Sequence, residues 1–100
     1  MNKVPLESTL QRKISKYLES LGCYVVKVVV ANKTGVPDLV FCYDGKFMAC
    51  EVKRKGLKRN VTKLQQYHID LINKTGGLAF VADSLDDVKL HLHKPLDFLE

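Results

Sequence analysis

The chain has 100 residues, of which 46% are hydrophobic and 27% are charged, a composition typical of one soluble globular domain over residues 1–100. Its formal net charge of +5 favours an anionic partner, with nucleic acid first. No apolar run approaches the length of a membrane span, and the N-terminus lacks the apolar region of a signal peptide.

The first predicted element is an amphipathic helix over residues 6–21, closed by Gly22, a residue typical of helix C-termini. Its apolar residues repeat at helical spacing and share one face. Glu7 falls on the same face, where an unpaired buried carboxylate would be costly. Glu7 is therefore either a first-turn residue favoured by the helix dipole or a carboxylate directed at a functional site.

Residues 23–30 are almost entirely apolar and β-branched, with Lys27 as the one charge. Such a run predicts a central strand that is covered on both faces. Residues 31–35 form a short polar connection that contains Lys33 and leads into the next strand.

A β-hairpin is the strongest local prediction. Residues 39–43 and 47–52 are rich in strand formers, and Asp44-Gly45 lies between them. A two-residue turn at this position would pair Tyr43 with Lys46 and fix the register of the two strands.

The same register brings two carboxylates and an amine onto one face. Asp38 would lie opposite Glu51, and Lys53 would point the same way as Glu51 because side chains alternate along a strand. Like charges that face each other destabilise a sheet unless a cation such as Mg²⁺ compensates them. The alternative is a solvated strand edge at which Asp38 ends a turn.

A basic segment follows the hairpin. A run of charge is usually a solvated loop, but its position directly after the carboxylate strand favours contacts with phosphate. The residues that we expect to contact DNA are Arg54, Lys55, Lys58, Arg59 and, before the hairpin, Lys33.

Thr62 is a typical N-cap for a second helix that runs to about Thr75 and is closed by two glycines. On its helical wheel Gln65 falls within the apolar face, whereas Gln66 faces outward. A buried amide needs hydrogen-bond partners, which a cluster of charged groups would supply. His68 shares the apolar face, and we interpret it as a core residue rather than a ligand.

The apolar residues 78–82 are expected to form a short strand. After the preceding helix this strand would lie parallel to strand 47–52 in a β-α-β crossover. Residues 84–93 predict a short capped helix that Pro95 stops, and the apolar tail after it would pack on its own core or on a second subunit. The predicted fold class is therefore α/β, with the order α-β-β-β-α-β, a C-terminal helix, and a mixed sheet flanked by helices.

The cysteines Cys23, Cys42 and Cys50 are odd in number and lack Cys-x-x-Cys spacing. All three lie in apolar, strand-like segments. We interpret them as reduced core thiols of a cytoplasmic protein rather than as a disulfide set or a zinc site.

Three separate periodicity arguments place polar residues on inward-facing positions at one end of the sheet. Clustered, buried titratable groups are candidates for an active site. The predicted catalytic residues are Glu7, Asp38, Glu51, Lys53 and Gln65.

The motifs that carry a family resemblance are Pro37-Asp38 and Glu51-Val52-Lys53, with Glu7, Leu10-Gln11 and Gly35-Val36 before them and Gln65 ahead of an apolar helix after them. The first two resemble the PD-(D/E)XK nuclease motif. The whole set is similar to the VRR-NUC (virus-type replication-repair nuclease) family, in its small stand-alone bacteriophage or bacterial form. The resemblance covers nearly the whole chain and implies a restriction-endonuclease-like core.

This resemblance implies a Mg²⁺- or Mn²⁺-dependent phosphodiesterase that acts on DNA. Lys53 would orient or deprotonate the attacking water, and Gln65 would hydrogen-bond Lys53 or that water. The implied metal ligands are Asp38, Glu51, the Val52 carbonyl and Glu7.

The stand-alone members also imply a homodimer that acts on branched DNA such as Holliday junctions or flaps, in the host cytoplasm if phage-encoded. Symmetric cleavage of a four-way junction needs two sites related by a two-fold axis. Two alternatives stay open: a general repair or restriction-like nuclease on the same fold, and a catalytically silent DNA-binding subunit. A silent subunit often lacks a metal-binding carboxylate or the lysine, and here the set is complete.

Overall fold

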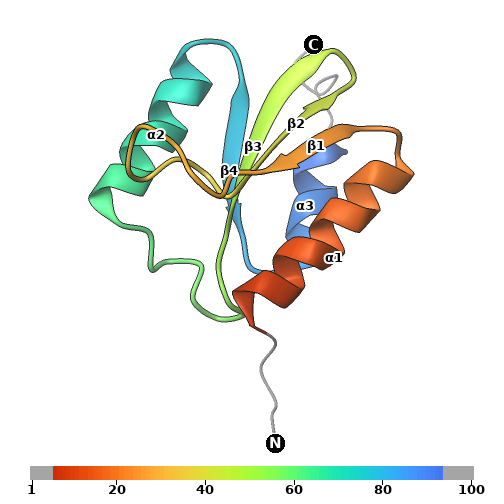
Figure 1. Cartoon of the computed structure of the whole chain (residues 1–100), viewed down its shortest axis with the longest axis horizontal. Helices are drawn as coiled ribbons and strands as arrows, with labels where there is room; N and C mark the ends of the chain where they lie inside the picture. Colours follow the sequence, from red (N-terminus) through yellow and green to blue (C-terminus); the bar gives the residue numbers. More distant parts are fainter. Residues whose placement is uncertain (1–5, 94–100) are drawn as a thin grey trace, which may run out of the picture.

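Helices cover both faces of a four-stranded sheet in the computed structural model, which describes residues 6–93 (Figure 1). One face carries α2, and the other carries α1 and α3. This mixed sheet and its C-terminal helix confirm the predicted α/β class. The elements in chain order are α1 (Glu7–Ser20), β1 (Tyr24–Lys27), β2 (Leu39–Tyr43), β3 (Lys46–Val52), α2 (Lys63–Lys74), β4 (Leu78–Ala82) and α3 (Leu85–Leu92).

The hairpin of β2 and β3 has the predicted turn and register. Asp44 and Gly45 adopt φ angles of 53° and 77°. A type I′ turn requires such left-handed conformations at both central positions, which is why Asp-Gly is favoured there. Tyr43 pairs with Lys46, as predicted, and the antiparallel ladder continues from this pair toward the other end of the hairpin.

The β3-α2-β4 unit forms the predicted parallel crossover. A reciprocal capping box starts α2. The Thr62 Oγ1 accepts a hydrogen bond from the Gln65 amide at 3.1 Å, and the Gln65 Oε1 accepts one from the Thr62 amide at 3.0 Å. The cap therefore fixes both the start of α2 and the side chain of Gln65.

Strand β1 lies at an edge of the sheet, so the prediction of a central strand over residues 23–30 is wrong. The strand order is β1-β2-β3-β4, and within residues 6–93 β1 pairs with β2 alone. Beyond the strand, Val29 and Val30 are 81% and 88% exposed. An apolar run indicates that a segment suits a strand, but the number of neighbouring strands depends on how the whole sheet assembles.

Buried apolar side chains are distributed unequally over the two faces of the sheet. The face under α1 and α3 carries a continuous cluster of eleven buried residues in the described part of the chain, with Phe41 and Met48 among its largest. The α2 face carries a cluster of three, namely Ala49, Ile69 and Ala79. The α2 face therefore has room for polar groups.

The cysteines do not all lie in the core. Cys50 is buried, Cys23 is half-buried and Cys42 is exposed, and all three are free. The prediction of a core thiol is therefore wrong for Cys42, because its side of the sheet extends beyond the area that α2 covers.

None of the helices within residues 6–93 is long and apolar enough to cross a membrane. The predicted packing of the tail after Pro95 lies outside the described residues.

Candidate active site

Asp38 and Glu51 meet at the end of the β2-β3 ladder. The last pair of this ladder is Leu39 with Cys50, so the next position on each strand belongs to Asp38 and Glu51, on the α2 face. The Val52 amide donates a hydrogen bond to Asp38 Oδ2 at 2.8 Å. This bond fixes the Asp38 carboxylate against β3.

The Glu51 carboxylate is buried and only partly satisfied. The residue is 3% exposed. Its Oε2 accepts a hydrogen bond from Gln65 Nε2 at 3.1 Å and lies 3.7 Å from Lys53 Nζ. Its Oε1 is buried and has no hydrogen-bond partner among the described residues. A buried polar atom without a partner is rare in folded proteins and calls for an explanation.

Burial is the main cause that raises the pKa of the Glu51 carboxyl group to about 8, and the neighbouring charge of Asp38 raises it further. The ammonium of Lys53 acts in the opposite direction. At neutral pH Glu51 therefore retains its proton unless a cation compensates the charge.

Gln65 connects the lysine to the carboxylate. Its Oε1 accepts a hydrogen bond from Lys53 Nζ at 3.1 Å while its Nε2 donates to Glu51. Gln66 faces the other way and bonds Asp70 at 2.8 Å. The helical wheel therefore selected the correct glutamine of the adjacent pair.

Glu7 lies at the same end of the sheet but outside this cluster. It is half-buried at the first turn of α1, and its charge is the smallest of the influences that raise the pKa of Glu51. Across residues 6–93, no three histidine, cysteine, aspartate or glutamate side chains gather closely enough to hold a metal ion. The structure thus brings together four of the five predicted residues, and a metal-binding role for Glu7 stays a prediction.

The basic segment after β3 is pinned to the start of α3. The Gly56 amide donates to Asp83 Oδ2 at 3.0 Å, and Lys58 Nζ pairs with Asp87 Oδ2 at 3.0 Å. Lys58 is therefore already engaged within the chain. The other predicted DNA contacts are exposed: Lys33, Arg54, Lys55 and Arg59.

Sequence reasoning did not assign a structural role to Gly35, which the structure shows to be required. Its φ of +93° is in the left-handed region, and a Cβ atom added there would lie 2.9 Å from Leu64 Cγ and 3.0 Å from the Leu64 carbonyl carbon. The same loop contacts α2 again through Thr34, whose carbonyl lies 3.0 Å from His68 Nε2. The glycine thus lets the segment before Asp38 pack directly on α2.

Sequence reasoning named Gln11 only within the family motif and did not predict its burial; the residue is 9% exposed. It lies one helical turn after Glu7, and the i, i+4 spacing of two polar residues on one helix was the available signal.

The donor set fits a hard divalent cation. Carboxylate oxygens are the ligands that Mg²⁺ prefers, and the Glu51 Oε1 beside Asp38 supplies a buried acceptor that has no hydrogen-bond donor within residues 6–93. The residues in position to hold such an ion are Asp38 and Glu51.

Comparison with known proteins gives one informative result. No family model matches the sequence, and no curated protein matches it. A solved structure described as "VRR_NUC domain" is similar over 89% of this chain and 97% of its own, with 28% sequence identity and a TM-score of 0.70. The fold, the clustered site residues and this solved structure together confirm that the chain resembles the VRR-NUC domain family.

Proposed function

We propose that this protein is a Mg²⁺- or Mn²⁺-dependent DNA endonuclease that prefers branched DNA. The similarity to a VRR-NUC domain supports a nuclease. The observation that carries the metal-dependent part is the buried, unpartnered oxygen of Glu51 beside Asp38, with an amine and an amide held at its side.

A divalent cation would relieve the cost of this arrangement. The burial of Glu51 favours its protonated form, and a cation between Glu51 and Asp38 would favour the charged form instead. Glu7 and the Val52 carbonyl are the candidate additional ligands. When bound, the ion would neutralise charge on the scissile phosphate and lower the pKa of a bound water.

Lys53 is the residue of the chain that would act on the attacking water. Its side chain is 12% exposed and its Nζ is held by Gln65 Oε1. An amine fixed in this way would orient the water and stabilise the charge that develops on the phosphate. Gln65 would act as a positioning residue because it orients both Lys53 and Glu51.

Recognition would rely on phosphate contacts rather than on base sequence. The exposed cations Arg54, Lys55 and Arg59 follow the site directly, and Lys33 lies in the loop before Asp38. Contacts of this kind make binding strongly dependent on salt and weakly dependent on sequence.

We expect a homodimer, because each chain supplies one candidate site and symmetric cleavage of a junction needs two. The uncovered part of the α2 face supports this expectation. Tyr24, Cys42 and Phe47 form one exposed row across three strands, and Val26 next to it is also exposed.

Sedimentation should therefore give the mass of a dimer, and Val26→Lys should favour the monomer. A wild-type monomer at high concentration would contradict this expectation.

The test of the proposed function is cleavage of labelled four-way junction, flap and linear duplex DNA by the purified protein. The reactions would contain Mg²⁺, Mn²⁺ or a chelator. Asp38→Asn should abolish cleavage, since the amide keeps the acceptor for the Val52 amide but loses the charge. Asp44→Asn is the matched control, because asparagine is favoured in the type I′ turn.

Metal-dependent cleavage of the junction that Asp38→Asn abolishes and Asp44→Asn retains would support the proposal. Equal cleavage of plain duplex would favour a general repair or restriction-like nuclease. Binding without cleavage of any DNA would favour a silent DNA-binding subunit.

A further inference from the structure

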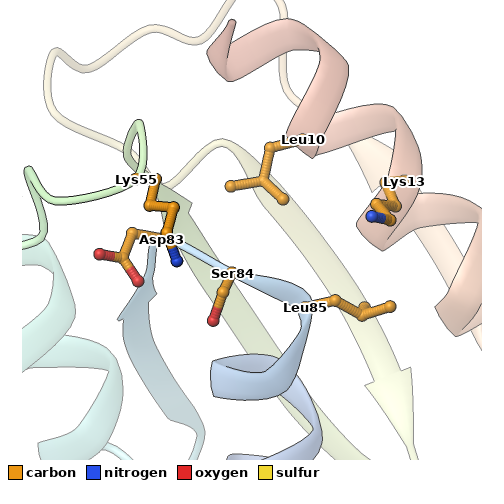
Figure 2. Close-up of a pocket in the computed structure, with 6 residues that line it drawn as sticks. All are labelled: Leu10, Lys13, Lys55, Asp83, Ser84 and Leu85. Atoms are coloured by element: carbon orange, nitrogen blue, oxygen red, sulfur yellow. The ribbon is translucent and has the colours of Figure 1, made fainter. Parts of the chain in front are cut away.

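A small pocket lies beside the candidate active site, on the other face of the sheet end. It has a volume of about 160 Å³. Figure 2 shows Leu10 from α1 and Leu85 from the start of α3 on two of its sides, with Lys55 and Lys13 toward its ends. Asp83 and Ser84, at the corner between β4 and α3, complete the lining.

The pocket is close to the site along two elements, the segment after β3 and helix α1. Lys55 follows Lys53 by two residues, so their Cα atoms are no more than about 7.6 Å apart. Leu10 lies one helical turn after Glu7, on the same side of α1. A nucleotide next to a scissile phosphate at Lys53 would therefore be within reach of this pocket.

The positively charged side chains at the pocket suit an anionic ligand. Lys13 and Lys55 are exposed, and neither has a carboxylate within ion-pair distance among residues 6–93. The one acidic residue, Asp83, accepts a hydrogen bond from the Gly56 amide, and its carboxylate points away from Leu10 in Figure 2. The two ammonium groups thus remain available to phosphates.

The interior has the opposite character. Leu10 and Leu85 supply apolar walls, and the volume is close to that of the engineered apolar cavity of about 150 Å³ that takes up one benzene ring. A flat ring between apolar side chains, carried on a phosphate chain that lysines bind, describes a nucleotide whose base has left the stack. A base inside a duplex is paired and stacked and cannot enter.

We propose that this pocket holds one unpaired base of the DNA beside the scissile phosphate, with Lys13 and Lys55 on the flanking phosphates. The inference rests on the proposed function and narrows its substrate to DNA that has an unpaired nucleotide at the cleavage site. Flaps meet this requirement, as does a branch point at which a base pair has opened, and continuous duplex does not.

The first experiment measures binding in chelator, so that no cleavage is needed. One fluorescein-labelled DNA carries a one-nucleotide flap with a cytosine base, and a second carries an abasic residue at the same position. The phosphates are the same in both, so any difference comes from the base. Fluorescence anisotropy should show that the flap with the base binds at least about fivefold more tightly. Equal dissociation constants would overturn the proposal.

A matched pair of variants on α3 tests the location. Leu85→Trp fills the pocket and should reduce the ratio of the two dissociation constants to about one. Leu90→Trp introduces the same side chain at a position on the same helix that is 69% exposed, and it should leave the ratio unchanged. A base preference that persists in folded Leu85→Trp would overturn the assignment to this pocket.

Methyl NMR of the wild-type protein keeps the test independent of how well Leu85→Trp folds. The methyl resonances of Leu10 and Leu85 should shift with the base-containing flap and remain in place with the abasic one. Shifts that are the same with both DNAs would contradict the proposal.

The two proposals fail in different ways. Absence of cleavage in Mg²⁺ and Mn²⁺, with the base preference intact, would overturn the nuclease and support the pocket. Cleavage without a base preference in the binding assay would overturn the pocket alone.

Discussion

The two faces of the sheet contrast in what they bury. The α1/α3 face is apolar and continuous, and Phe41 and Ile14 within it are 1% and 0% exposed. The α2 face has a core of three small or medium residues, and beside it lie a buried carboxylate and an exposed apolar row. The first face supplies the stability of the domain, and the second is open to chemistry and to partners.

This contrast explains how the domain tolerates the free-energy cost of burying a carboxylate at the candidate site. Glu51 is on the α2 face, whereas its neighbours Cys50 and Val52 are fully buried on the opposite face. The strand is therefore held by apolar packing on one side while it presents a destabilising carboxylate on the other. Such a division places a strained functional group on a rigid support.

The largest expected effect comes from the charge of Glu51. Glu51→Gln should lower the rate of metal-dependent cleavage at least about a thousandfold, because the amide keeps the shape but loses the charge that would hold the cation. Single-turnover cleavage of a labelled junction measures this. Glu19→Gln, at an exposed position of α1, should leave the rate unchanged. A comparable loss in both variants would mean that the loss does not come from the charge of Glu51.

The second largest expected effect is a difference in packing energy between the two faces. Phe41→Ala should lower the free energy of unfolding by about 3–5 kcal/mol, because it leaves a cavity in the continuous core. Val40→Ala, one residue away on the half-buried α2 face, should cost about 1 kcal/mol. Urea unfolding monitored by circular dichroism gives both values. Equal costs would remove the contrast between the faces.

The carboxylate should also appear in the dependence of stability on pH. The pKa of Glu51 is raised from 4.5 to about 8 in the folded state. Below pH 4.5 both states hold the proton; as the pH rises toward 8 the unfolded state loses it first, so folding stability falls. The loss between pH 4.5 and pH 8.5 relative to Glu51→Gln should be on the order of 4 kcal/mol.

Urea unfolding of both proteins in chelator at pH 4.5 and pH 8.5 measures this loss. Saturating Mg²⁺ should restore the stability of the wild type at pH 8.5 but not that of the variant. A difference between the two proteins that does not change with pH would show that Glu51 ionises normally.

The smallest expected effect distinguishes the two glutamines of α2. Gln65→Ala should lower cleavage about 10–100-fold, because Lys53 and Glu51 lose the amide that orients them. Gln66→Ala removes only a surface hydrogen bond to Asp70 and should retain full activity. Equal activity of the two variants would indicate that the amide serves only to cap α2.

Local chemistry explains why much of the fold was predictable. The Asp-Gly turn requires left-handed conformations at two positions, and this fixed the register that aligns Asp38 with Glu51. The caps at Thr62 and Ser84 and the helical period placed α2 and α3 and selected Gln65 over Gln66. Each of these features depends on residues within a few positions of one another.

The sequence by itself therefore determined the elements, the hairpin register and the four clustered residues of the site. Only the tertiary structure decided that β1 is an edge strand, that Glu7 stays outside the cluster and that Asp83 and Asp87 pin the basic segment. The physical reason is the separation in sequence between the residues that interact. Turn and period preferences act along the chain, whereas the neighbours of a strand or a loop depend on contacts between segments that are far apart in sequence.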